Sequence, residues 1–387
     1  MIRRWAAFVI FQPPDRQRAN LFLDTFSPFP VRYVQITSNR SKQDVLMTIT
    51  KTQRGHHPIK RLSMATGALL MACIAAAEPS GGRSSFGLTP LTDMTAEARY
   101  KGEDGGLYGA GQNQPPPAHL DAARRQAARI TPLDTEGRPA PDGKIGLISI
   151  SMSNATQEFS LFKQLADKDP QKSPHVTIVD CAQGGQAMAE WVNPLARPWV
   201  EADRRLAQAS VSAKQVQVAW IKLANKLPQG DLHQHGKKLQ DDTLAVLQNA
   251  QARFPNLRVA YLSSRTYGGH STTPLSPEPY AYESAFAARW LIQAQLAGDP
   301  ALRFEPTETP AQVPLLLWGP YLWTDGVVPR KGDGLIWERA DVARDGTHPS
   351  GSGRRKVADL LLAFFKENAL AATWFTTGGQ KDGLTPQ

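Results

Sequence analysis

The sequence predicts an α/β fold in which a five-stranded parallel sheet is covered by helices on both faces. Five short apolar runs predict the strands, at residues 145–150, 176–179, 216–221, 257–262 and 313–318. Four segments with apolar residues at helical spacing lie between them, at residues 156–166, 199–209, 239–252 and 280–296. Near-continuous apolar strands that alternate with helices are typical of a parallel sheet buried in a three-layer α/β/α sandwich.

Five strands in this pattern predict a doubly wound, flavodoxin-like sandwich. Sites in such folds gather at the carboxyl ends of the strands. The residues with the strongest chemical signal follow four of the predicted strand ends: Ser153, Gly184, Gly185, Asn225, Asp345 and His348. The topology therefore predicts that these residues share one edge of the sheet.

The segment Asp345-Gly-Thr-His348-Pro-Ser precedes a helical run at residues 354–366. An Asp three residues before a His can orient that His as a general base, which requires a nucleophile elsewhere in the chain. The same residues also suit a plain turn followed by a helix start. His270, in a Gly-rich segment, is the alternative base.

The nucleophile is expected where the first strand ends in a small-residue turn that opens a helix. Ser153 stands at this turn, where a serine hydroxyl is exposed beside free backbone N–H groups. Ser151 is the alternative nucleophile. A serine or asparagine here also suits a helix N-cap, and Ser151, Ser153 and Asn154 all qualify.

The order Ser, Gly, Asn and Asp-x-x-His resembles the SGNH/GDSL hydrolase superfamily over about residues 144–367. Asp345 and His348 match the last conserved sequence motif of the family, Asp-x-x-His. Gly185 fits the glycine of the family's second motif. Ser151-Met-Ser153 stands where the family has Gly-Asp-Ser, and Lys222-Leu-Ala-Asn225 keeps only the Asn of Gly-x-Asn-Asp.

The resemblance implies that Ser153 attacks an acyl carbonyl, that His348 accepts its proton and that Asp345 orients the imidazole. It also implies an oxyanion hole made by the N–H groups of Ser153 and Gly185 and by the side-chain amide of Asn225. Losing one such donor typically costs about 2.7–4 kcal/mol of transition-state stabilisation.

Residues 264–313 form an insertion that is expected to wall a substrate cleft together with Gln183, Gln186 and Arg265. The aromatic residues of its helix are expected to be core, because they recur at helical spacing: Tyr282, Phe286 and Trp290. No cofactor or metal is predicted. His233-Gln-His235 has a spacing that can bind metal, but it is expected in a polar loop without Cys, and the Gly-rich stretches lack a P-loop lysine and Rossmann spacing.

The formal net charge of +9 belongs to the N-terminal segment. Residues 1–77 hold 11 Lys/Arg and 3 Asp/Glu, which leaves 33 basic against 32 acidic residues in the rest of the chain. A body this close to neutrality argues against nucleic acid as a partner.

Basic residues followed by an apolar stretch at 62–77 resemble a secretory signal peptide, predicted over residues 47–78. The stretch is shorter than the about 20 residues of a membrane-spanning helix, so no integral span is expected; a buried or anchoring helix is the alternative. Residues 1–46 are interpreted as a non-native extension, with Met47 or Met64 as the true start. Leu-Met-Ala-Cys73 resembles a lipobox, which makes a lipid anchor at Cys73 the alternative to soluble export.

The remaining chain is expected to comprise a Gly/Pro-rich arm at residues 79–143, which wraps the domain, and a hydrolase domain at residues 144–387. The predicted protein is an exported serine esterase acting on O-acyl groups, above all O-acetyl groups, of a carbohydrate or similar small substrate. A carbohydrate-binding or structural protein that has lost activity is the alternative, and a lipase or thioesterase is the rival within the enzyme class.

Overall fold

The computed structural model describes residues 83–306 and 308–379 in full and the backbone of four strands within the first 50 residues. The chain divides into two compact units, Met1–Ala77 and Glu78–Gln387. Within these described residues, no helix is both long enough and apolar enough to cross a bilayer.

The first unit contains an antiparallel sheet that the sequence did not lead us to expect. Its strands pair in chain order: β1 (Ala7–Ile10), β2 (Ala19–Leu23), β3 (Tyr33–Ser38) and β4 (Val45–Thr50). Apart from residues 47–50 in β4, the expected signal segment and the lipobox cysteine Cys73 lie outside the described residues.

The second unit is built on a five-stranded sheet in which every strand pairs in parallel, so the predicted fold class is confirmed. The strands are, in spatial order, β6 (Val176–Asp180), β5 (Ile145–Ile150), β7 (Val216–Lys222), β8 (Val259–Ser263) and β9 (Leu315–Trp318). The chain adds β6 on one side of β5 and then β7, β8 and β9 on the other. This reversal of winding at β5 is the flavodoxin-like order.

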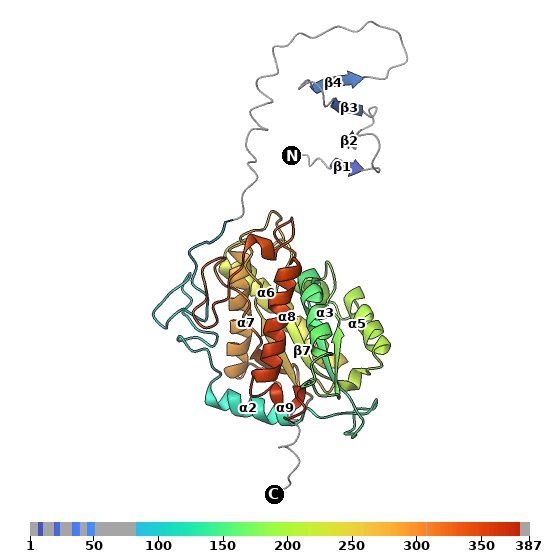
Figure 1. Ribbon diagram of the computed structural model, residues 1–387, viewed down its shortest axis with the longest axis vertical. Coiled ribbons are helices and arrows are strands. Elements are labelled where there is room, and N and C mark those ends of the chain that lie inside the picture. Colours follow the sequence, from blue (N-terminus) through green and yellow to red (C-terminus); the bar gives the residue numbers. More distant parts are fainter. Residues whose placement is uncertain are drawn as a thin grey trace. The chain divides into compact units, whose positions relative to one another are not determined.

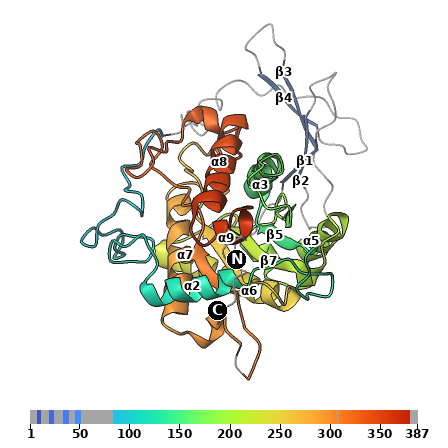
Figure 2. The ribbon, with the colours of Figure 1, turned by 60° about the horizontal axis from the view of Figure 1, so that its bottom comes forward.

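Helices cover both faces of this sheet (Figures 1 and 2). On one face α3 (Ser153–Ala166) and α8 (Gly351–Glu367) lie side by side, and the short α9 (Ala372–Phe375) contacts α8. The other face carries α5 (Arg197–Gln208), α6 (Leu232–Arg253) and α7 (Tyr280–Leu296), with α4 (Met188–Trp191) against α6. A further helix, α2 (Pro117–Ala128), contacts β8, β9 and α9.

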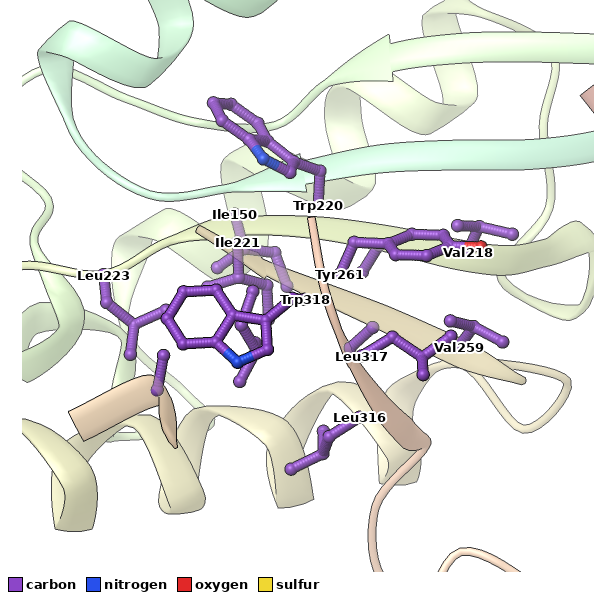
Figure 3. Packing of buried hydrophobic residues seen from close by; sticks show 14 of the residues in the cluster. Ile150, Val218, Trp220, Ile221, Leu223, Val259, Tyr261, Leu316, Leu317 and Trp318 are labelled. Carbon is purple, nitrogen blue, oxygen red and sulfur yellow. The ribbon is translucent and has the colours of Figure 1, made fainter. Parts of the chain in front are cut away.

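The core fills the spaces between the sheet and the two helical layers. Figure 3 shows Trp220 on one side of the sheet and Trp318 on the other, as the alternation of side chains along parallel strands requires. Trp220 stacks on Phe159 of α3, with ring centroids 5.5 Å apart. Tyr261 meets Phe365 of α8 edge to face at 5.7 Å. These contacts fix α3 and α8 against the same side of the sheet.

The arm, which belongs to the second unit, is held to the rest of that unit by buried carboxylates. Asp325 is 2% exposed and accepts four hydrogen bonds from residues 85–88, one from the Ser85 hydroxyl and three from backbone N–H groups. Glu283 of α7 accepts the Tyr100 hydroxyl at 2.6 Å and the Lys101 ammonium at 2.7 Å. A loop tied down by buried charges in this way is part of the folded domain.

Candidate active site

The site begins where α3 and α8 start at the same edge of the sheet. Ser153 is the first residue of α3, which follows β5, and His348 stands three residues before the first residue of α8. Because these helices pack side by side (Figure 1), their starts bring the two residues together across 195 positions of the chain. The Ser153 Oγ atom lies 2.9 Å from His348 Nε2.

The Ser153 hydroxyl does not cap its helix. The N-cap residue is Met152, whose side chain makes no capping hydrogen bond. The first N–H groups of a helix have no partner within it and carry partial positive charge, so they suit a developing oxyanion. Ser153 therefore presents both a hydroxyl that faces an imidazole and a helix start that favours negative charge.

Asp345 holds the other side of the imidazole. Its Oδ2 lies 2.6 Å from His348 Nδ1, and its Oδ1 accepts the backbone N–H groups of Thr347 and His348 at 3.0 Å each. Partial burial acts to raise the pKa of Asp345, but these hydrogen bonds outweigh it and hold the pKa below the ordinary 3.8. The carboxylate is thus ionised near neutral pH and can stabilise a protonated His348.

The Asp345-Gly346 turn packs tightly against the segment that contains His270. Gly346 has φ of +64°, and a Cβ there would lie 1.6 Å from the His270 carbonyl oxygen. The Asp345 carbonyl accepts the Thr272 N–H at 3.0 Å. Only glycine fits this turn, so the Asp-Gly sequence is needed to place His348 as well as to turn the chain.

The two alternatives to this pairing are turned away from it. Ser151 is fully buried, and its hydroxyl donates to the Lys222 carbonyl oxygen at 2.5 Å. The His270 ring is 3% exposed and packs edge-on against Tyr267, with centroids 5.3 Å apart. Burial lowers the pKa of His270 below its ordinary 6.5. Neither side chain forms a hydrogen bond with Ser153 or His348.

The glycine turn after β6 lies beside Ser153. A Cβ added to Gly184 would lie 4.0 Å from the Ser153 Cβ, whereas one added to Gly185 would meet nothing within 4 Å. Gly185 has φ of +75°, a conformation that other residues rarely adopt. A side chain at Gly184 would therefore touch Ser153, whereas the position of Gly185 is open.

Asn225 is held by neighbouring groups. Its Nδ2 donates to Asp242 at 2.5 Å, and its Oδ1 accepts the Ala189 N–H at 2.9 Å. A primary amide carries two hydrogens, so one N–H stays available beyond the Asp242 bond. The loop itself lies near the start of α3, because Ala224 forms a small buried cluster with Met152, which precedes Ser153, and with Ala187, which follows the glycine turn.

The expected cleft residues have different surroundings. Gln183 is buried, and its amide donates to the backbone carbonyls of Cys181 and Pro198, so it is not a cleft residue. Arg265 is 5% exposed and its charge acts on Glu158 and Glu278, which again places it inside the protein. The Gln186 side chain is half-buried. Of the predicted aromatic core residues, Tyr282 and Phe286 are buried and Trp290 is partly buried against the core.

Several supporting residues beneath the site were missed from the sequence. Lys222 donates to both Glu158 carboxylate oxygens at 2.7 Å, and both side chains are buried. Burial raises the pKa of Glu158 and lowers that of Lys222. Asp180 accepts hydroxyl hydrogen bonds from Ser149 and Ser160 as well as from Thr156, which ties α3 to the ends of β5 and β6. In the sequence, these residues could be noticed only because Asp180 and Lys222 are charged residues at the ends of apolar strands.

The His233-Gln-His235 segment lies in the first turns of α6, so its placement in a polar loop was wrong. His235 pairs with Glu283, and His233 stacks on Trp290 at 6.2 Å. In residues 83–306 and 308–379, no three His, Cys, Asp or Glu side chains converge in a way that would hold a metal ion.

Among known proteins, the chain has a distant likeness to a solved structure. No family model matches the chain, and no curated protein matches it. Among solved structures, the chain is similar to a crystal structure of a proposed acylhydrolase from Bacteroides fragilis, with a TM-score of 0.36 and 13% sequence identity. The match covers 67% of this chain and 100% of that chain. The assignment of the site therefore depends on its own geometry.

Proposed function

We propose that this protein is a serine hydrolase that cleaves O-acyl esters. One observation carries the proposal: Ser153 Oγ lies 2.9 Å from His348 Nε2 while Asp345 Oδ2 lies 2.6 Å from His348 Nδ1. A nucleophile within hydrogen-bond reach of a base that a third group orients is the arrangement that acyl transfer requires.

In the first half of the reaction, Ser153 Oγ forms a bond to the acyl carbon as its proton passes to His348 Nε2. The carbonyl oxygen becomes an oxyanion, which the N–H groups at the start of α3 and at the Gly184-Gly185 turn stabilise. The bond between the acyl carbon and the alcohol oxygen then breaks, and His348 returns its proton to the leaving alcohol. Asp345 stays ionised and stabilises the imidazolium.

In the second half, water attacks the acyl group on Ser153. His348 accepts a proton from this water, and the new oxyanion meets the same N–H groups. The bond from the acyl carbon to Ser153 Oγ breaks, the acid leaves, and the proton on His348 returns to Ser153. One ester and one water thus give one acid and one alcohol.

We further propose an exported enzyme whose substrate is a small O-acyl ester, above all an O-acetylated carbohydrate. The signal-like segment at residues 47–78, the aromatic content of residues 264–323 and the habits of the superfamily that the chain resembles support this choice. The second candidate is a carbohydrate-binding or structural protein without activity, which is favoured by Ser151-Met152 standing where the superfamily that the chain resembles has Gly-Asp.

The test is hydrolysis of p-nitrophenyl acetate by the wild type and by Ser153→Ala and His348→Ala. Each change is expected to lower kcat on the order of 10³-fold or more, because the triad acts as a unit. A fluorophosphonate probe is expected to label Ser153, as located by mass spectrometry, and to label Ser151→Ala as well. A wild type that neither hydrolyses the ester nor takes the label contradicts the enzyme and leaves the binding protein.

A further inference from the structure

The residue that follows the proposed nucleophile makes a contact that the reaction scheme does not use. Asn154 is 2% exposed, and its Nδ2 donates to the Thr347 carbonyl oxygen at 2.7 Å. The two residues are 193 positions apart in the chain. Asn154 is bonded to Ser153 and Thr347 to His348, so this single hydrogen bond joins the immediate neighbours of the two reacting groups.

Thr347 is held on its other sides by its own loop and by the segment after β8. Its N–H donates to Asp345 Oδ1 at 3.0 Å. Its hydroxyl contacts those of Ser271 at 2.6 Å and Thr273 at 2.8 Å. These bonds shape the loop and attach it to residues 271–273, whereas Asn154 attaches it to α3.

The start of α3 is a fixed reference for this bond. One turn after Asn154, Glu158 forms the buried ion pair with Lys222 at the end of β7. Ser160 donates to Asp180 at the end of β6 at 2.7 Å. Because α3 is bonded to two strand ends, a group on its first turn can set the position of the loop against the sheet.

We infer that Asn154 is a positioning residue that sets the distance between Ser153 Oγ and His348 Nε2. The inference rests on the proposed function. The Asn154 side chain acts through the Thr347 carbonyl, to which it donates its hydrogen bond, and not on the imidazole itself. A displacement of about 1 Å at a reacting pair can cost on the order of 10²-fold in rate, so the loss of this bond affects the proton transfer.

Asparagine is the side chain that suits this role. It is short, neutral and able to donate a hydrogen bond, and Thr347 offers a carbonyl that can only accept one. Aspartate has nearly the same shape but, when ionised, places a carboxylate against that carbonyl. The pair Asn154→Ala and Asn154→Asp therefore separates loss of the bond from its replacement by repulsion.

The chain provides a matched control at the opposite edge of the sheet. Asn256 lies just before β8, and its Nδ2 donates to the Lys214 carbonyl oxygen at 2.8 Å, just before β7 begins. The bond has the same donor and acceptor groups and also joins two segments, but it is exposed whereas that of Asn154 is buried. Asn256→Ala removes it at the amino ends of the strands, whereas the proposed site lies at their carboxyl ends.

The experiment compares kcat and KM for p-nitrophenyl acetate, the rate of fluorophosphonate labelling and Tm in the full chain and its variants. Asn154→Ala is expected to lower kcat and the labelling rate on the order of 10- to 100-fold, with KM within about twofold. Asn154→Asp is expected to lose at least as much. Asn256→Ala is expected to change Tm little, because its bond is exposed, and to keep kcat within about twofold.

The outcomes separate this inference from the proposed function. If the wild type neither hydrolyses the ester nor takes the label, both the proposed serine hydrolase and the positioning role of Asn154 are contradicted. If the wild type is active and Asn154→Ala keeps kcat within about twofold, the positioning role alone is overturned. The same holds if Asn256→Ala loses as much kcat as Asn154→Ala, because a general loss of stability would then explain both.

Discussion

Ser151 and Ser153 are only two positions apart, but their side chains lie in different surroundings. Ser151 follows the last residue of β5 and donates to a backbone carbonyl, while Ser153 begins α3 and faces His348. Their identities and spacing do not distinguish them. The difference depends on the residue at which the strand ends and the helix begins, and sequence patterns define such boundaries only to within a few residues.

At the same scale, Asp345→Asn tests the orientation of His348. The amide keeps the shape of the side chain but cannot stabilise an imidazolium, and it favours the wrong tautomer of the ring. We expect kcat for p-nitrophenyl acetate to fall on the order of 10³- to 10⁴-fold while Tm changes little. A variant that retains more than about a tenth of the wild-type kcat would remove Asp345 from the mechanism.

Glu278 gives a prediction about pH and stability. Burial raises its pKa from 4.5 to about 6, against hydrogen bonds from Trp323, Gly268 and Tyr282. A carboxyl whose pKa is raised on folding stabilises the protein below its unfolded pKa, and this contribution is lost as pH rises through the folded pKa. Between pH 4.5 and about 6 the free energy of unfolding should therefore fall by about 2 kcal/mol through this group.

Urea denaturation at several pH values, for the wild type and for Glu278→Gln, measures this contribution. The variant has no titrating group at position 278, so its unfolding free energy should lack the fall between pH 4.5 and about 6. Parallel pH dependence in the two proteins would show that Glu278 does not cause the change.

At the scale of elements, apolar content located the strands well. The predicted runs at residues 145–150 and 216–221 correspond to β5 and β7 within a residue, and the helix predicted at 280–296 coincides with α7. The helix predicted at 239–252 begins seven residues earlier, because the first turns of α6 are polar and read as a loop. Apolar periodicity locates the buried face of a helix, but it does not locate a helix start that is polar and exposed.

The contacts of individual polar side chains could not be predicted from the sequence. Gln183, Arg265 and Asn225 were all expected to face a substrate, yet each bonds or pairs mainly with protein groups. Their positions at strand ends were predicted correctly, but the direction of a side chain depends on partners that are distant in the chain. The partners here are Pro198, Glu158 and Asp242, which no local pattern links to these positions.

The buried ion pair of Glu158 and Lys222 connects α3 to the end of β7. The effect of removing this pair on the free energy of unfolding can be measured. Lys222→Met leaves a buried carboxylate without its partner, and Glu158→Gln leaves a buried ammonium. Each is expected to cost about 3–5 kcal/mol of unfolding free energy. The double variant should cost clearly less than the sum, because neither charge is then left alone. Additive losses in chemical denaturation would show that the two residues act separately.

At the scale of the whole second unit, the attachment of the arm to the rest of the unit is expected to depend on Asp325. This carboxylate receives the Ser85 hydroxyl and the N–H groups of residues 86–88. Asp325→Ala should release residues 85–88, because hydrogen bonds to charged groups are worth about 1.5–3 kcal/mol each. Limited proteolysis should then cut near residue 87 well before the rest of the unit is digested.

Asp93 is a suitable comparison, because its carboxylate accepts the Lys331 N–H at 2.9 Å through a more exposed contact. Asp93→Ala should leave the cleavage rate near residue 87 close to that of the wild type. Equal protection of residues 85–88 in the wild type and Asp325→Ala would mean that other contacts hold the arm.

The reversal of winding at β5 has a practical consequence for engineering. Segments leaving β5 and β7 depart toward opposite helical layers, so the loop at residues 226–230 and the start of α3 belong to separate structural supports. Changes to the sequence of that loop should thus leave the position of Ser153 at the start of α3 largely unaltered.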